Sequence, residues 1–102
     1  MSMDPALSKP SIRVRLRMRA ESAGGRHSPF SEDYAPHLVV SGDTLRLPVR
    51  AIQCPHPTAP GDTAEVIFEL MYYPQVDYSG LKQGCEFEMH EGPKIVATGT
   101  VL

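Results

Sequence analysis

Four arginines occupy alternate positions near the start of the chain, at Arg13, Arg15, Arg17 and Arg19. Alternate residues of a β-strand lie on one face about 6.8 Å apart, so this arginine ladder would be a basic stripe roughly 20 Å long. Such a stripe could follow a phosphate backbone or bind an acidic protein. The favoured interpretation is instead cross-strand neutralisation by acidic residues of a neighbouring strand. The candidates are Glu65 and Glu69, or Glu86 and Glu88.

A glycine-rich loop carries the second group of basic residues. The stretch Ser22–Phe30 reads "SAGGRHSPF" and places Arg26 and His27 directly after two glycines. An arginine beside glycines can approach a nucleic-acid backbone closely and donate to it. The simpler alternative is a surface turn that connects two strands.

Metal binding and catalysis have weaker support. The possible metal ligands lack the paired spacing of a zinc site, so we predict no metal and no cofactor. Cys85 and His90 could form a nucleophile and base, but five residues apart on one strand they face opposite sides. We therefore predict that the chain is not an enzyme. The possible ligands are Cys54, His56, His27, His37, His90 and Cys85.

Alternating apolar and polar residues define the elements that must position these groups. The fourth run, "TAEVIFELMYY", has the strongest pattern of a central strand. Six such runs separated by turn signals, with no convincing helix, predict a small all-β antiparallel barrel or sandwich. The runs cover residues 12–20, 37–40, 44–52, 63–73, 84–90 and 94–102.

The same alternation predicts the core. Pro48 lacks a backbone donor, which indicates an edge or bulged strand, and an open edge there could permit dimerisation. The expected core residues, besides one face of the last strand, are Ile12, Val14, Leu16, Met18, Leu45, Leu47, Val66, Phe68, Leu70, Phe87 and Met89.

Composition sets the broad class. A chain of 102 residues with 41% hydrophobic and 22% charged residues is typical of one soluble domain. No apolar run approaches the roughly 18 residues of a membrane span, and no signal-peptide core is present, so we predict a cytoplasmic protein without membrane contact. We expect residues 1–10 to be a flexible tail and residues 11–102 to form the domain. Residues 1–50 hold eight Lys/Arg and five Asp/Glu, whereas residues 51–102 hold two and seven.

Three stretches in order resemble the C-terminal β-barrel, domain 3, of the elongation factor Tu family. "GGRHSPF" followed by "YAPH" resembles the family's "GGRHTPF…YRPQ". "PGDTAEVIFELMYYP" resembles "PGDNVKMTVELIHP", and "GCEFEMHEGPKIVATGTV" resembles "GLRFAIREGGRTVGAGVV". The resemblance covers residues 11–102 and implies a six-stranded antiparallel Greek-key barrel.

The resemblance also implies a function. The family's domain 3 touches the backbone of the T stem of aminoacyl-tRNA, and the matching positions here are Arg26, His27, His37, Glu91 and Gly92. The sequence contains no G-x-x-x-x-G-K-[ST] motif, so no GTPase domain is expected within it. The stretch 41–59 matches poorly, and the arginine ladder is not a family feature.

These observations predict a non-enzymatic module that contacts tRNA-like RNA or the translation machinery. The alternative is a protein-docking module for a GTPase or translation factor, without RNA. A third hypothesis is a purely structural remnant of such a domain whose partner is unrelated. The tyrosines at positions 72, 73 and 78 either anchor a protein partner or cap the end of the barrel core.

Overall fold

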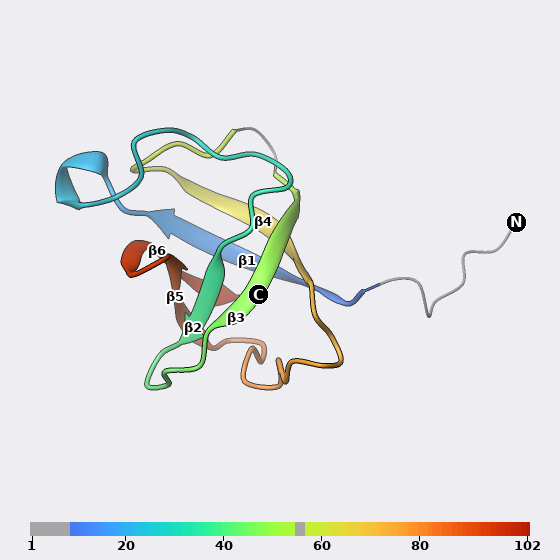
Figure 1. The fold of residues 1–102 in the computed structure, drawn as a ribbon. Coiled ribbons are helices and arrows are strands. Elements are labelled where there is room, and N and C mark those ends of the chain that lie inside the picture. The colour runs from blue at the N-terminus through green and yellow to red at the C-terminus, as the bar shows by residue number, and fades with distance from the viewer. Residues whose placement is uncertain (1–8, 55–56) are drawn as a thin grey trace, which may run out of the picture.

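The computed structural model describes residues 9–54 and 57–102 as a closed, six-stranded antiparallel β-barrel (Figure 1). The strands pair around the barrel in the order β1-β4-β3-β2-β5-β6, and β6 pairs back with β1. Strands β5, β2, β3 and β4 therefore lie side by side in the order of a Greek key, as predicted. The strands are β1 (Ser11–Met18), β2 (His37–Val40), β3 (Leu47–Gln53), β4 (Thr63–Leu70), β5 (Glu86–Glu91) and β6 (Lys94–Val101).

Alternation along the strands fills the interior. In β1, Val14, Leu16 and Met18 are buried, while the arginines between them are exposed. Phe68 of β4 and Phe87 of β5 are the largest fully buried side chains. The predicted core is confirmed apart from Ile12, which is partly buried, and Leu45.

Leu45 was predicted to lie in the core, and this prediction is wrong because 52% of the residue is exposed. Strand β3 begins only at Leu47, and the preceding turn changes the direction of the chain. In that turn the Asp43 carboxylate accepts hydrogen bonds from the backbone N–H groups of Thr44 and Leu45. The alternation therefore does not extend back from the strand into this turn.

The prediction of an open edge at Pro48 is also wrong. Pro48 lies opposite His37 of β2, and β3 pairs on its other side with β4, so the barrel is closed there. The β2–β3 pairing is short, which tolerates a residue without an N–H. The predicted bulge does occur in this strand, but farther along, between Ala51 and Gln53.

The last strand buries two consecutive residues, Val96 and Ala97, which strict alternation does not allow. A register shift between β5 and β6 at Met89 and His90 accounts for this. Bulges of this kind turn side chains toward the same face.

The last two residues of the predicted N-terminal tail contact the barrel. Pro10 and Lys9 were assigned to a flexible tail, yet the Pro10 carbonyl accepts from the Leu70 N–H at 2.9 Å and the Lys9 Nζ donates to the Tyr73 carbonyl at 3.1 Å. Residues 1–8 lie outside the described residues.

The only helical element described is the single 3-10 turn η2 (Glu21–Ala23). No helix among the residues described is long and apolar enough to cross a membrane.

Candidate functional site

The loop between β1 and β2 is fixed close to the barrel by Gly25. A Cβ atom at this position would lie 2.1 Å from the Arg19 carbonyl oxygen, so a larger residue would displace the backbone. The Gly25 N–H donates to the Ala20 carbonyl at 2.9 Å. The glycine therefore brings the chain back against the end of β1 and sets the starting point of the Arg26 side chain.

Arg26 forms a compact unit with Tyr34 and Glu91. Its guanidinium lies over the Tyr34 ring, 4.5 Å from the centroid, and forms an ion pair with the Glu91 carboxylate. The Tyr34 hydroxyl donates to the same carboxylate oxygen, Oε2. Tyr34 also stacks on Phe30, with the ring centroids 4.5 Å apart. Burial raises the pKa of Tyr34 to about 12, so the phenol stays protonated and remains a donor at neutral pH.

The β5–β6 turn holds the next residues. Gly92 adopts a φ of 57°, the left-handed conformation that a two-residue hairpin loop requires. Its carbonyl accepts a hydrogen bond from the exposed Arg46 guanidinium. Arg46 thus joins the turn that precedes β3 to the turn that follows β5.

Two histidines face each other across neighbouring strands at this end of the barrel. His37 of β2 lies opposite His90 of β5. Burial, together with the charge of Arg46 and the neighbouring His90, lowers the pKa of His37. His37 is therefore neutral at pH 7 and can offer a hydrogen bond but no charge. The His90 Nε2 lies 3.2 Å from the Glu88 carboxylate.

Four of the five residues predicted to contact RNA lie together at this end of the barrel. Together with Tyr34, Arg46 and His90, these four residues form a group that we call the Glu91 cluster. His27, the fifth predicted residue, lies apart from it: its side chain is 80% exposed and its Nδ1 lies 2.8 Å from the Glu21 carboxylate. The cluster consists of Arg26, Tyr34, His37, Arg46, His90, Glu91 and Gly92.

Three members of the Glu91 cluster were not predicted as site residues. Tyr34 lies within the "YAPH" stretch, where an aromatic residue close to an Arg gives a signal for a cation–π contact. Arg46 and His90 carry no local signal, because their positions depend on which strands become neighbours. Since Glu91 compensates Arg26, the cluster offers donors and acceptors in fixed positions rather than a strong positive field.

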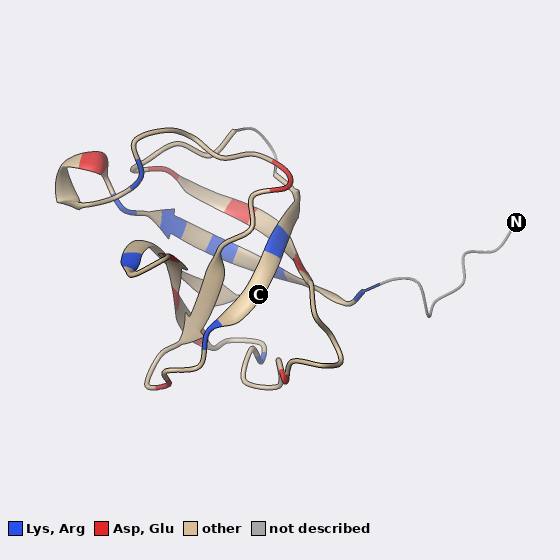
Figure 2. Ribbon diagram, in the orientation of Figure 1, with Lys and Arg blue, Asp and Glu red and all other residues tan. Residues whose placement is uncertain are grey.

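The arginine ladder runs along β1 and just beyond it, where blue bands alternate with tan ones (Figure 2), and all four arginines are exposed. Arg15 forms an ion pair with Glu65, directly opposite on β4, at 3.7 Å. More than half of each side chain is exposed, so the pair contributes little to stability. Within the described part of the chain, the other three arginines form no ion pair. Cross-strand neutralisation is therefore correct for Arg15 alone.

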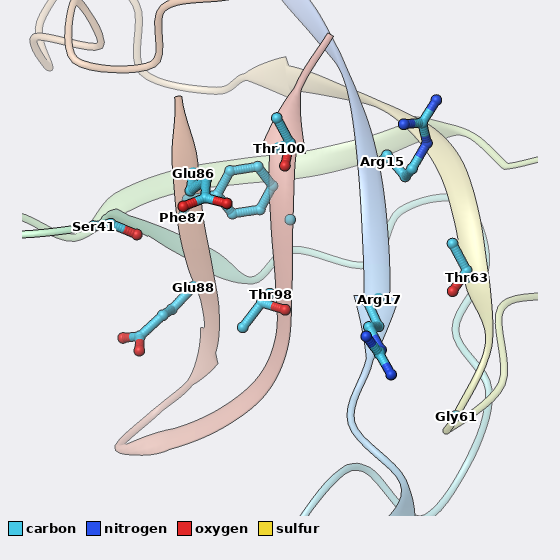
Figure 3. A pocket seen from close by; sticks show the side chains of 11 residues that line it. Arg15, Arg17, Ser41, Gly61, Thr63, Glu86, Phe87, Glu88, Thr98 and Thr100 are labelled. Carbon is cyan, nitrogen blue, oxygen red and sulfur yellow. The ribbon is translucent and has the colours of Figure 1, made fainter. Parts of the chain in front are cut away.

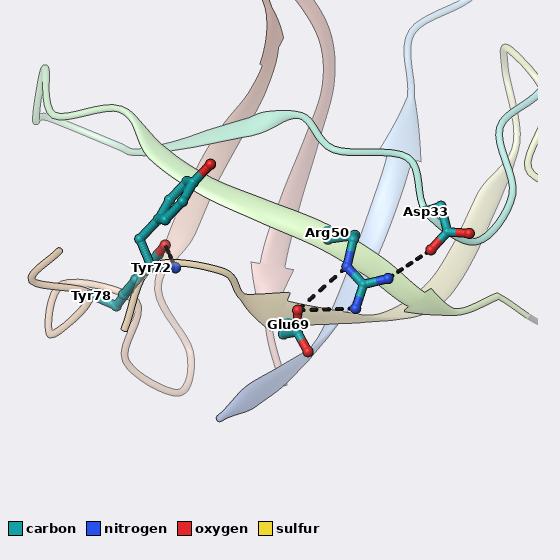
Figure 4. A network of polar contacts seen from close by, with 5 residues as sticks. All are labelled: Asp33, Arg50, Glu69, Tyr72 and Tyr78. Atoms are coloured by element: carbon teal, nitrogen blue, oxygen red, sulfur yellow. Dashed lines mark hydrogen bonds and ion pairs between the residues drawn. The ribbon is translucent and has the colours of Figure 1, made fainter. Parts of the chain in front are cut away.

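The other acidic residues proposed to neutralise the arginine ladder either bind a different arginine or lie on a strand that is not next to β1. Glu69 lies opposite Ser11 and binds Arg50 of β3 at 3.1 Å, and Arg50 also binds Asp33 at 2.7 Å (Figure 4). This network ties the long β1–β2 loop to the β3–β4 pair. Glu86 and Glu88 lie on β5, which is separated from β1 by β6 (Figure 3). The second proposed pair is thus not on a strand next to the ladder.

The three tyrosines differ in burial, and only Tyr78 has the contacts expected of a core cap. Tyr78 is buried, its hydroxyl donates to the Pro48 carbonyl at 2.5 Å and accepts from the Tyr72 N–H at 3.1 Å, so it caps the core (Figure 4). Tyr72 and Tyr73 are about half exposed. Tyr73 lines a mostly apolar groove of about 680 Å³ together with Pro10, Leu70, Pro74, Val76 and Tyr78.

The cysteines are poor nucleophiles. Burial and the neighbouring Glu32 carboxylate raise the pKa of Cys54 to about 11, and burial raises the pKa of Cys85. Both thiols are free. Cys85 precedes β5 rather than sharing the strand with His90. Residues 9–54 and 57–102 contain no group of three or more potential metal ligands, and His56 lies outside them.

No known protein-family model matches the chain.

Proposed function

We propose that this protein is a non-catalytic cytoplasmic module that contacts the backbone of structured, tRNA-like RNA through the Glu91 cluster. The proposal joins the resemblance to domain 3 of elongation factor Tu with the arrangement of the barrel end. The observation that carries it is the convergence of Arg26, His37, Glu91 and Gly92 from three separate segments. In the resembling family the matching region touches the backbone of the T stem of tRNA.

The chemistry of the Glu91 cluster suits hydrogen bonding to a sugar–phosphate backbone. Arg46 and neutral His37 are the groups available to a ligand, since Arg26 is held between Tyr34 and Glu91. Arg46 supplies the accessible positive charge beside a turn whose backbone is exposed at Gly92. Backbone contacts of this kind position an RNA without reading its sequence.

The test is fluorescence anisotropy of labelled tRNA at low and at physiological salt. Arg46→Gln should weaken binding and reduce the salt dependence by about one unit of log–log slope, because one phosphate contact is lost. Lys82→Gln is the matched control, since it removes one exposed cation in the loop before β5 that is not part of the Glu91 cluster. Absence of saturable binding at low salt would overturn the proposal, and so would an equal loss in both variants.

A protein-docking role is the second candidate, and one observation favours it. The groove lined by Tyr73 is mostly apolar, and Tyr73 itself is about half exposed. Aromatic residues beside a groove commonly anchor protein partners. A GTPase or translation factor that binds here should be retained by the wild-type protein after nuclease treatment and lost with Tyr73→Ala, while Arg46→Gln should retain it.

A further inference from the structure

One outer face of the barrel carries a row of acids and a row of arginines with short side chains between them (Figure 3). The acids lie on β5, the arginines on β1, and threonines of β6 form the floor. The resulting hollow has a volume of about 770 Å³. The rows are Glu86 with Glu88, Thr98 with Thr100, and Arg15 with Arg17.

The strand register places the three rows on common levels. Thr100 lies opposite Arg15 on one side and opposite Glu86 on the other. Thr98 lies in the same way between Arg17 and Glu88. Each level thus runs from acid through threonine to arginine, and the two levels repeat the same order.

This order is complementary to itself. Consider a two-fold axis that lies in the plane of the face and runs along β6. It exchanges the positions of the acidic row and the arginine row but keeps each level in place. In a pair of copies related by that axis, Arg15 of each copy lies over Glu86 of the other, and Arg17 over Glu88. The threonines meet their own counterparts at the centre. Contacts of this reciprocal kind define an isologous dimer interface.

We propose that the β5–β6–β1 face is a self-association surface whose occupant is a second copy of this chain, held by four reciprocal Arg–Glu pairs. The barrel closes all strand edges, so the copies meet through side chains and not by strand addition. The hydroxyls at the centre favour a hydrated contact. The association should therefore be weak and sensitive to salt.

The charge pattern favours a second copy over RNA on this face. Two carboxylates accompany the two arginines, and a polyphosphate following the arginines would approach the acidic row within two strand spacings, about 9–10 Å. A copy of the same face satisfies both rows at once. Among the described residues, Arg17 and Glu86 have no ion-pair partner within the chain, so both are open to an external partner.

Sedimentation velocity over a range of protein concentrations tests the proposal. The wild type should form dimers whose fraction falls as salt rises. Reversal of the charge of the basic row, Arg15→Glu with Arg17→Glu, should raise the dissociation constant by about tenfold or more, because four attractive pairs become repulsive. Reversal of the acidic row, Glu86→Arg with Glu88→Arg, should do the same. An equimolar mixture of the two variants, or all four changes in one chain, should restore the dimer.

A matched control separates the face from net charge. Arg46→Glu with Lys82→Glu changes the net charge as much as the basic-row reversal but leaves the face intact, so dimerisation should persist. A thermal melt of each variant checks that the barrel is folded. A wild type that stays monomeric at every concentration overturns the proposal, as does a dimer that survives both reversals. A basic-row reversal that abolishes tRNA binding by a monomeric wild type would assign the row to RNA instead.

Discussion

The guanidinium of Arg26 lies 4.5 Å from the centroid of the Tyr34 ring, and both side chains bind the same oxygen of Glu91. This unit joins the β1–β2 loop to the β5–β6 turn, two segments far apart in the sequence. It is assembled from a cation, an aromatic face and a shared acceptor, each of which is partly shielded from water. The strength of the unit therefore depends on the negative charge of Glu91.

Glu91→Gln should lower the free energy of unfolding by about 1–3 kcal/mol, because Arg26 loses its counter-ion in a partly buried position. Urea unfolding measures the change. Glu65→Gln removes the partner of Arg15 in an exposed pair and should change stability by less than about 0.5 kcal/mol. Equal effects of the two substitutions would show that the Glu91 cluster is no more than a surface ion pair.

His37 should titrate below the ordinary range of histidine, since burial and the charge of Arg46 disfavour its protonated form. The unfolded chain then binds the proton more readily than the folded chain. The contribution of His37 to stability is thus present above its unfolded pKa and is lost as pH falls through that value toward the lower folded pKa. Imidazole NMR signals in the wild type and in His37→Gln would assign the titration. Substitution of Arg46 by Gln should move the His37 pKa upward, and a downward move would contradict this account.

Tyr78→Phe should destabilise the barrel by about 1–3 kcal/mol, because the Pro48 carbonyl and the Tyr72 N–H lose their shared partner. The ring itself remains, so packing is preserved. Tyr73→Phe is the control and should change stability by less than about 0.5 kcal/mol, since Tyr73 is about half exposed. Thermal unfolding of the two variants provides the comparison. Indistinguishable melting temperatures would refute a capping role for the hydroxyl.

Gly99→Ala should destabilise the barrel by about 1–3 kcal/mol. A Cβ atom there would lie 2.5 Å from the Phe87 ring and 2.8 Å from the Arg15 carbonyl oxygen, so a packed core side chain and a strand backbone must move. Gly80→Ala meets only Val40, at 3.6 Å, and should be nearly neutral. Chemical unfolding of both proteins tests the difference, and a tolerated Gly99→Ala would mean that Phe87 can repack.

The fold follows from the sequence because its strands alternate cleanly. Val14 and Leu16 face inward for the same reason that Arg15 faces outward. Pro48 led to a wrong prediction of an open edge, because a missing backbone donor suggests an edge strand. Here Pro48 lies in a short strand pairing inside a closed barrel. Leu45 was wrongly predicted to lie in the core because alternation does not reveal where a strand begins.

The candidate site could be predicted only in part. Arg26, His37, Glu91 and Gly92 were predicted through a resemblance, whereas the positions of Arg46 and His90 depend on contacts between distant segments. No local pattern reports such contacts. The partners of Glu69 illustrate the same limit, since Arg50 rather than the arginine ladder binds it.

The pairing of β1 with β6 has a consequence for the order of folding. Val14 lies opposite Val101, so the first strand of the barrel finds one of its two neighbours only when the last strand is present. During synthesis β1 can pair with β4 once that strand has emerged, but its other side stays open until β6 leaves the ribosome. Closure through such distant residues is slow compared with local pairing. One edge of β1 is therefore exposed until β6 has been made, and this is the stage at which a chaperone would matter most.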